Sequence, residues 1–188
     1  MRNLVFTGRF QPLHSGHLNM IRAIKKNFPE DLLIICIIRN TIEEVLPSQE
    51  NEFNKISRKK QTKENNPLPN WDRYMLLKLA IDSEKLLSKN TIILFRERSD
   101  LDWKKSISDL PNDRVFIFPH CQKEKFDQEK MKYYQQQGEQ IEILESEGSG
   151  DVSGTKIREQ IRNKDFSLEF IPQSCREYFI KNCLKYFE

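Results

Sequence analysis

The chain has 188 residues, of which 37% are hydrophobic and 31% are charged, and this length suits one domain, spanning 1–188, with an ample core. Its formal net charge of +3 at pH 7 is too small to indicate a protein that binds nucleic acid. The longest uninterrupted apolar run covers the seven residues 32–38, far fewer than the roughly 20 that a membrane-spanning helix needs.

The beginning of the chain shows no signal-peptide pattern, because Arg2 is followed directly by a strand-like run. We therefore expect a cytoplasmic protein whose partners are small molecules, neither nucleic acid nor membrane, and we leave a homo-oligomer open. The four cysteines show no metal-binding spacing: Cys36, Cys121, Cys175 and Cys183. Their neighbours are apolar or helical, so we expect reduced structural thiols rather than zinc ligands or disulfides.

The first predicted element is a strand at 4–6, which is followed by the turn GRFQPLHSGH at 8–17 and then by an amphipathic helix. α/β proteins bind phosphate at such a turn, because the free N–H groups at the start of a helix attract an anion. Gly8 allows a ligand to approach the backbone. His14 and His17 are three residues apart, so they share one side of the first helical turn and can face the same phosphate.

This turn resembles the signature of the nucleotidyltransferase superfamily that carries a His-x-Gly-His motif. Its full form is most similar to the archaeal-type nicotinamide mononucleotide (NMN) adenylyltransferases. The alternative is an ordinary glycine turn with polar surface residues, although two of the three histidines of the chain lie here. The resemblance implies that His14 and His17 are catalytic. It also implies a nucleotide-binding role for four neighbours: Gly8, Arg9, Phe10 and Gly16.

The second predicted strand is the apolar, largely β-branched run 32–38, as expected of a strand that is covered on both faces. Residues 40–69 then lose all periodicity and contain a cluster of basic residues. We expect them to form a flexible insertion or lid, with a solvated charge run as the alternative. The segments 57–62 and 66–68 resemble a Ser-x-x-Lys and Asn-Pro-Phe stretch of the family, which implies that Lys60 contacts substrate.

The apolar residues between 70 and 87 predict one long helix, with Asn70 as its cap and Asp72 in its first turn. Arg73 matches the arginine of the Gly-Glu-Arg element of the family. The resemblance implies that this arginine contacts phosphate, and the alternative is a surface arginine.

A third strand is predicted at 91–95, and the residues that follow it resemble the Asn-x-x-Trp stretch of the family. Asp100 stands in the place of the asparagine. The resemblance implies that Asp100 lies at the substrate and that Trp103 stacks on the nicotinamide ring. The alternative for Trp103 is a helix residue that packs on the sheet.

A fourth strand is predicted at 114–118. The family usually continues with a Ser-Gly-Asn turn near the two substrates, whereas this chain has PHCQK at 119–123. This departure leaves the identity of the acceptor open. A helix closed at Gly138 and a fifth strand at 141–144 follow.

A second glycine cluster ends in the segment SGTKIR at 153–158, which resembles the second signature of the superfamily, Ser-x-Thr-x-Ile-Arg, at the start of a helix. Ser153 and Thr155 can cap this helix and, with Gly154 between them, bind phosphate oxygens. Arg158 can reach the β and γ phosphates with a bidentate fork. The alternative is a plain capped helix. The tail is predicted to end in a further helix with a buried apolar stripe.

Five apolar strands that alternate with helices predict an α/β fold, with a single doubly wound, parallel, five-stranded sheet of Rossmann-like type and C-terminal helices. The resemblance implies the strand order 3-2-1-4-5, with the site at the carboxyl ends of strands 1 and 4. It also implies transfer of AMP from the co-substrate ATP to NMN by direct in-line attack, giving NAD and pyrophosphate, with Mg2+ bridging the phosphates and no metal ligand from the protein. Two alternatives are a related adenylyl or cytidylyl transferase that uses another phosphate-monoester acceptor, and a non-catalytic nucleotide-binding regulator.

Overall fold

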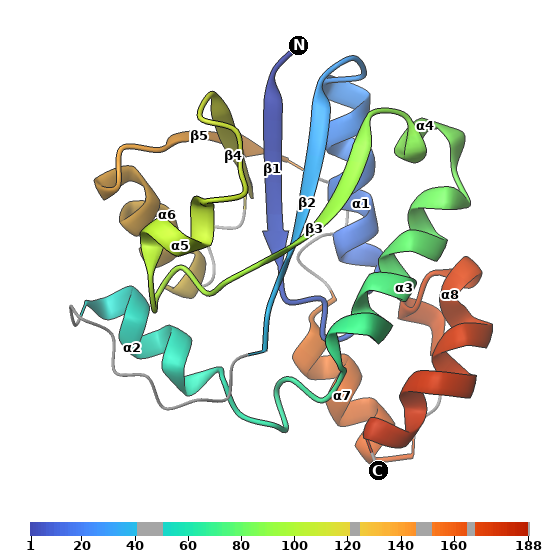
Figure 1. Ribbon diagram of the computed structural model, residues 1–188. Coiled ribbons are helices and arrows are strands. Elements are labelled where there is room, and N and C mark those ends of the chain that lie inside the picture. Colours follow the sequence, from blue (N-terminus) through green and yellow to red (C-terminus); the bar gives the residue numbers. More distant parts are fainter. Residues whose placement is uncertain (41–50, 121–124, 146–151, 165–167, 188) are drawn as a thin grey trace.

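A computed structural model describes residues 1–40, 51–120, 125–145, 152–164 and 168–187. Five parallel strands form one sheet in the order β3-β2-β1-β4-β5 (Figure 1). Their bounds are β1 (Asn3–Gly8), β2 (Leu32–Ile38), β3 (Thr91–Arg96), β4 (Arg114–Pro119) and β5 (Gln140–Leu144). The predicted sheet and its strand order are confirmed.

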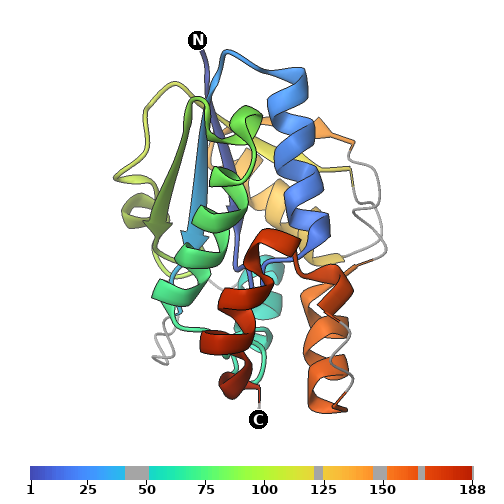
Figure 2. The ribbon, with the colours of Figure 1, turned by 90° about the vertical axis from the view of Figure 1, so that its right-hand side faces the viewer.

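Helices cover both faces of the sheet, because alternate residues of each strand point to opposite sides. Leu4 of β1 joins an apolar cluster with residues of α1 (Ser15–Asn27), α3 (Asn70–Asp82), α7 (Gly154–Arg162) and α8 (Gln173–Tyr178). Figure 2 looks onto this helical layer. On the other face, the neighbouring Val5 joins a smaller cluster with residues of α5 (Trp103–Ile107) and α6 (Lys125–Gln136).

The central strand β1 marks the point where the winding of the sheet reverses. It pairs in parallel with β2 on one side and with β4 on the other. From β1 the strand order continues to β2 and β3 on one side and to β4 and β5 on the other, so the helical connections on the two sides lie on opposite faces of the sheet. A crevice therefore opens beyond the carboxyl ends of β1 and β4. The fold therefore places the β1–α1 turn at the edge of the sheet where α/β proteins bind their ligands.

The prediction of one long helix over 70–87 is wrong. Helix α3 ends at Asp82, and the short helix α4 (Lys85–Ser88) follows it. The hydroxyl of Ser83 donates a hydrogen bond to the Ala80 carbonyl at 2.7 Å and so competes with the helical ladder. The new turn buries Leu87 completely. The N-cap position of α3 is taken by Pro69, one residue before the expected Asn70.

The expected structureless segment 40–69 contains a helix, α2 (Glu52–Lys59). Asn51 caps this helix by accepting a hydrogen bond from the Asn54 N–H at 2.8 Å. Phe53 is 4% exposed, and its ring stacks on Tyr133 of α6 with a centroid distance of 5.0 Å. The expectation of lost periodicity is therefore wrong for 52–59. Residues 41–50 of the expected insertion lie outside the described part of the chain, and the lid remains a prediction.

The C-terminal segment packs as predicted. Pro172 caps α8, and the chain continues through η2 (Phe179–Cys183) and η3 (Leu184–Tyr186), after the earlier single turn η1 (Leu168–Phe170). The predicted stripe lies in the core: Cys175, Phe179, Cys183 and Phe187 are buried and Tyr178 packs against them. Cys36, Cys175 and Cys183 are free and buried, while Cys121 lies outside the described residues. None of the described helices has the length and apolarity that crossing a membrane requires.

Candidate functional site

A cavity of about 370 Å³ opens beyond the carboxyl ends of β1 and β4. Residues from both ends of the chain line it, together with the end of α2, the segment after β3 and the inner face of α6. Twelve of the fourteen residues predicted for the site are among the lining residues: Gly8, Arg9, Phe10, His14, Gly16, His17, Lys60, Asp100, Ser153, Gly154, Thr155 and Arg158. The two predicted residues outside the lining are Arg73 and Trp103.

Phe10 determines the shape of the β1–α1 turn. Its backbone has a φ of 51°, in the left-handed region, and its side chain is 1% exposed. A Cβ atom on Gly8 would lie 2.8 Å from Cζ of the Phe10 ring, closer than van der Waals contact allows. Gly8 is therefore required for the packing of Phe10. Gly8 also lines the cavity, and the expectation that its backbone comes close to a ligand remains a prediction.

The rings of His14 and His17 lie against each other at the start of α1, tilted by 33°. Their ring centroids are 3.7 Å apart, and the Phe10 ring lies 4.9 Å from that of His17. The Nδ1 atoms of both histidines are buried and make no hydrogen bond within the described part of the chain. A buried polar atom without a partner is costly, so these two nitrogens suit a ligand that supplies the missing hydrogen bonds.

Both imidazoles are neutral at pH 7. Burial, reinforced by the Arg158 guanidinium, lowers the pKa of His14 to about 4. Burial also holds the pKa of His17 well below its usual value, with further contributions from His14 and Arg9. No carboxylate of the described residues raises the pKa of either imidazole, and an anionic ligand would do so.

The second signature meets the first through Arg158. This side chain is 3% exposed, and its Nη1 donates to the Gln11 carbonyl at 2.6 Å. Its Nη2 donates to Asn65 Oδ1 and to Thr155 Oγ1, each at 3.0 Å. A Cβ atom on Gly154 would lie 2.9 Å from the same Gln11 carbonyl oxygen, so only glycine allows this approach. The fold thus brings residues 147 positions apart into one hydrogen-bonded unit.

The start of α7 is capped as predicted. Ser153 is the N-cap residue, and its side chain accepts a hydrogen bond from the Lys156 N–H at 3.3 Å. Burial and the charge of Arg9 lower the pKa of Arg158 to about 10, which leaves this guanidinium charged at pH 7.

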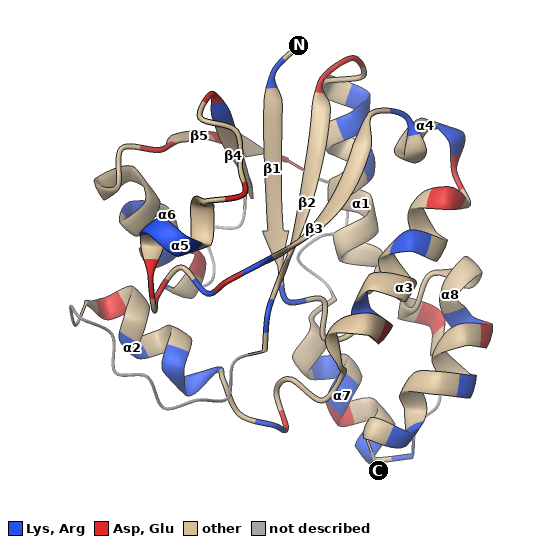
Figure 3. Cartoon of the chain, in the orientation of Figure 1, with Lys and Arg blue, Asp and Glu red and all other residues tan. Residues whose placement is uncertain are grey.

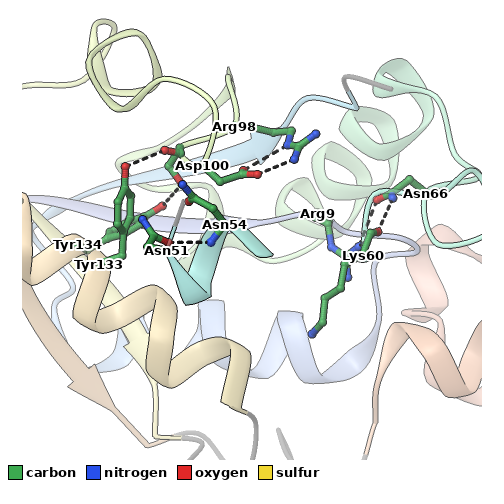
Figure 4. A network of polar contacts seen from close by, with 10 residues as sticks. Arg9, Asn51, Asn54, Lys60, Asn66, Arg98, Asp100, Tyr133 and Tyr134 are labelled. Atoms are coloured by element: carbon green, nitrogen blue, oxygen red, sulfur yellow. Dashed lines mark hydrogen bonds and ion pairs between the residues drawn. The ribbon is translucent and has the colours of Figure 1, made fainter. Parts of the chain in front are cut away.

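Cations outnumber carboxylates around the cavity. Among the described lining residues, five carry a cationic side chain and two carry a carboxylate: the cations are Arg9, Lys60, Arg98, Lys130 and Arg158, and the carboxylates are Asp100 and Asp127. Figure 3 shows basic segments at the end of β1, along α2 and on α7. Asp100 forms an ion pair with Arg98 in which both side chains are 3% exposed (Figure 4). The excess of positive charge suits an anionic ligand.

A family model described as cytidylyltransferase-like matches residues 5–160, a span that includes both signatures. The chain belongs to the cytidylyltransferase-like family. No curated protein matches its sequence at a significant level.

The nucleotidyltransferase-type fold of this family also appears in the comparison with solved structures. The chain is similar to a crystal structure of a bifunctional NMN adenylyltransferase/ADP ribose pyrophosphatase from Francisella tularensis, complexed with AMP and a Mn ion, with a TM-score of 0.62 and 16% identity. The alignment covers 99% of this chain and 51% of the other, so this chain spans about half the length of that protein. The likeness shows that the two share a fold.

Arg73 lies behind the cavity of this cytidylyltransferase-like chain. It is fully buried, and burial, with the charge of Arg9, lowers its pKa to about 9. Its Nη1 donates to the carbonyl of Arg9 at 2.8 Å and to that of Ile38 at 2.7 Å, and its Nη2 donates to Asn70. These contacts tie the β1–α1 turn and the end of β2 to α3. The structure therefore gives Arg73 a positioning role, without the predicted contact surface toward phosphate.

Trp103 packs on the sheet, as in the alternative that the sequence left open. Its ring makes edge contacts with Tyr134 and Tyr133, at centroid distances of 4.8 Å and 5.7 Å, and lies 6.4 Å from Phe116. It is partly buried and packs against the apolar cluster beneath α5 and α6. Asp100 and Trp103 keep the spacing of the Asn-x-x-Trp stretch of the family, but the indole ring points into the core instead of lining the cavity.

Trp103→Ala is therefore expected to lower the free energy of unfolding by about 2 to 4 kcal/mol, because truncating a large aromatic ring in a cluster leaves a cavity. The KM for the acceptor should change less than threefold. Urea unfolding and steady-state kinetics measure the two effects, and Trp103→Phe should restore most of the stability. If the variant is as stable as the wild type and only its KM for the acceptor rises, Trp103 contacts the acceptor and does not have the packing role described above.

Several lining residues were missed in the sequence. Gln11 lies in the first signature, where its side chain holds Leu68 by donating to the carbonyl at 3.0 Å and accepting from the N–H at 2.9 Å. Asn65 binds Arg158 from a segment without periodicity. Phe126 and Lys130 line the cavity from α6. Their spacing of four residues on a predicted helix is a signal that could have placed them on one face.

The neutral state of His14 predicts how stability depends on pH. The unfolded chain binds a proton at this histidine near pH 6.5, whereas the folded chain binds it only near pH 4. The unfolded state therefore binds more protons between these values, and the free energy of unfolding falls by about 3 kcal/mol as the pH decreases from 6.5 to 4. Urea unfolding of the wild type and of His14→Gln measures this effect, and the variant should lose that part of the slope. Identical slopes would contradict a buried neutral His14.

Proposed function

We propose that this chain transfers AMP from ATP to NMN, releasing pyrophosphate and forming NAD. The observation that carries the proposal is the pair of contacting imidazoles, His14 and His17, whose buried Nδ1 atoms have no hydrogen-bond partner among the described residues. In the same turn, the Gln11 carbonyl accepts a hydrogen bond from Arg158. Two imidazoles at the start of α1, together with the Arg158 guanidinium one turn into α7, would form a site for a chain of phosphates.

The triphosphate would lie over these two helix starts. An anion at this position supplies the counter-charge that the buried imidazoles lack, so it raises the pKa of His14 and favours proton uptake there. Protonated or neutral, the imidazoles present N–H groups to phosphate oxygens. Arg158 would hold the β and γ phosphates, where negative charge develops as pyrophosphate leaves.

The reaction needs no nucleophile from the protein. An oxygen of the acceptor phosphate attacks the α-phosphorus, the bond from that phosphorus to the bridging oxygen breaks, and pyrophosphate leaves with the electron pair. Alignment of two bound reactants lowers a barrier by about 7 to 11 kcal/mol. The residues that line the cavity would achieve it by holding both reactants, while Arg9 and Lys60 add positive charge beside them.

Mg2+ belongs to this scheme as part of the substrate, bound to the phosphates of ATP. The described residues contain no group of three histidine, cysteine, aspartate or glutamate side chains that could hold a metal ion. The lining carboxylate Asp100 is already paired with Arg98. Mg2+ is usually bound through substrate phosphates and water with few protein ligands, and when bound it neutralises charge on the transferring group.

A pyrophosphate-release assay with a panel of substrates tests the proposal. The purified chain is incubated with ATP or CTP, each with Mg2+, and with NMN, nicotinate mononucleotide or other phosphate monoesters. We expect release with ATP and NMN, and a dinucleotide product of the mass of NAD. Pyrophosphate release with CTP only would show that the nucleotide substrate is CTP and not ATP. Release with a different acceptor only would show that the acceptor is not NMN. No release with any pair would favour a nucleotide-binding regulator.

A further inference from the structure

Helix α6 turns one face toward the cavity. Four of its residues line the site at positions i, i+1, i+4 and i+8: Phe126, Asp127, Lys130 and Tyr134. We propose that this face is the binding surface for the acceptor mononucleotide, with Lys130 holding its phosphate and Phe126 stacking on its ring. The inference rests on the proposed function, because it assumes an acceptor that has both groups.

Lys130 places a positive charge beside the end of β1. Its Nζ donates a hydrogen bond to Thr7 Oγ1 at 2.8 Å, and Thr7 directly precedes Gly8. The ammonium also lies 5.3 Å from the ring centroid of Phe118 and 5.6 Å from that of Tyr134. Within the described part of the chain, no carboxylate pairs with this ammonium. Lys130 can therefore offer its remaining donors to an anion in the cavity.

The position of Lys130 suits the acceptor phosphate better than the triphosphate. His14, His17 and Arg158 belong to α1 and α7, which pack on one face of the sheet, whereas α6 packs on the other face (Figure 1). In-line attack requires the acceptor oxygen to approach the α-phosphorus from the side opposite to the leaving pyrophosphate. A cation from the second helical layer attracts the acceptor phosphate to that side and offsets the repulsion between two phosphate groups.

Phe126 differs from the other aromatic residues around the cavity in its exposure. Phe6, Phe10, Phe53, Phe118 and Tyr134 are all buried. Phe126 is partly exposed, and among the phenylalanine and tyrosine side chains of the described lining its ring alone keeps an accessible surface. Since Trp103 packs in the core, Phe126 is the aromatic side chain that can stack on an acceptor ring.

The present contact of Phe126 indicates which kind of ring it would bind. The Nζ of Lys60 lies 4.2 Å above the centroid of the Phe126 ring, so this ring already attracts a cation. The pyridinium ring of NMN carries a positive charge, and it can take the place of the ammonium on the same ring. Lys60 has a long flexible side chain, and once displaced it would remain near the phosphates.

The spacing of the two residues fits a mononucleotide. Phe126 and Lys130 are four positions apart on α6, which places their side chains about one helical turn, roughly 6 Å, apart along the same face. A ribose separates the phosphate of a mononucleotide from its ring by a comparable span. One acceptor molecule can therefore contact both residues at once.

Three variants and two fragments of the acceptor test this subsite. Lys130→Met removes the charge and keeps the unbranched stem, and Phe126→Leu removes the ring and keeps apolar bulk beside α2. Lys132→Met is the matched control, because Lys132 lies on the same helix, outside the cavity lining, in an exposed ion pair with Glu129. Nicotinamide riboside, which lacks the phosphate, and ribose 5-phosphate, which lacks the ring, serve as competitive inhibitors against NMN.

The two substitutions should produce opposite patterns. Lys130→Met should weaken the binding of NMN and ribose 5-phosphate about 10- to 100-fold and leave the riboside unchanged, since it removes a charge-assisted contact to phosphate. Phe126→Leu should weaken NMN and the riboside about 5- to 50-fold and leave ribose 5-phosphate unchanged. The KM for ATP should stay within threefold in both, and Lys132→Met should match the wild type. An equal rise in the KM for ATP, or unchanged NMN binding, would overturn the assignment.

Calorimetric titration of NMN separates this inference from the proposed function. If the wild type releases no pyrophosphate but binds NMN, the proposed reaction is wrong, and the Lys130 and Phe126 variants still decide the subsite through their affinities. Loss of affinity in these variants but not in Lys132→Met supports the subsite. Equal affinities, or no binding of NMN to the wild type, overturn it.

Discussion

His17→Ala is expected to lower kcat by about 100- to 1000-fold, the usual loss when one preorganised donor at developing charge is removed. In the proposed reaction His17 contributes a donor beside the triphosphate, and its ring is held in place by contacts with the rings of His14 and Phe10. The packing limits rotation of the imidazole. A water molecule that filled the space in His17→Ala would not be held in the same fixed position. Pyrophosphate release under saturating ATP and acceptor measures the effect.

The fold should survive this substitution. The pKa of His17 is held well below its usual value mainly by burial, which means that the folded state gains no stability from its charge. The matched control is His120→Ala, because His120 is exposed and lies outside the cavity lining. We expect His120→Ala to keep the kcat of the wild type. Activity of His17→Ala within a few-fold of the wild type, with an unchanged melting temperature, would remove His17 from the mechanism.

The strands of the sheet could be predicted from the sequence, because each strand shows a local pattern of apolar residues. The run 32–38 is apolar throughout, and a strand of this kind is stable only when both faces are covered. The two signatures account for ten of the twelve predicted residues that line the cavity, since each signature combines a turn, a glycine and a helix start whose geometry is local.

Tertiary contacts explain what the sequence did not reveal. The polar segment 52–59 becomes helical because Phe53 is buried between Phe126 and Tyr133 of a helix that lies some 70 to 80 positions further along the chain. Trp103 faces the core because Tyr134 and Phe116 surround its ring, and the spacing of a motif does not specify the direction of a side chain. Each of these outcomes depends on packing partners that no local pattern identifies.

Arg158→Lys is expected to lower kcat/KM for ATP by about 100-fold or more. The guanidinium makes three hydrogen bonds at once, to the Gln11 carbonyl, Asn65 and Thr155, and these fix its plane at the cavity wall. An ammonium is a point charge on a flexible stem and cannot reproduce these three hydrogen bonds together with a contact to phosphate. The variant therefore keeps a positive charge but loses the fixed plane of the guanidinium and the contact that joins the two signatures.

Arg162→Lys is the control for this substitution, because Arg162 lies one turn further along α7, is exposed, and donates only to the Glu64 carbonyl among its described contacts. We expect its kinetics to match the wild type. The loss in Arg158→Lys should appear with ATP, while the KM for the acceptor changes little, since the acceptor surface assigned to α6 lies in the other helical layer. Equal kinetics for Arg158→Lys and the wild type would mean that the arginine only stabilises the turn. If Arg158→Lys raised only the KM for the acceptor, Arg158 would bind the phosphate of the acceptor. The positions proposed for ATP and for the acceptor would then have to be exchanged.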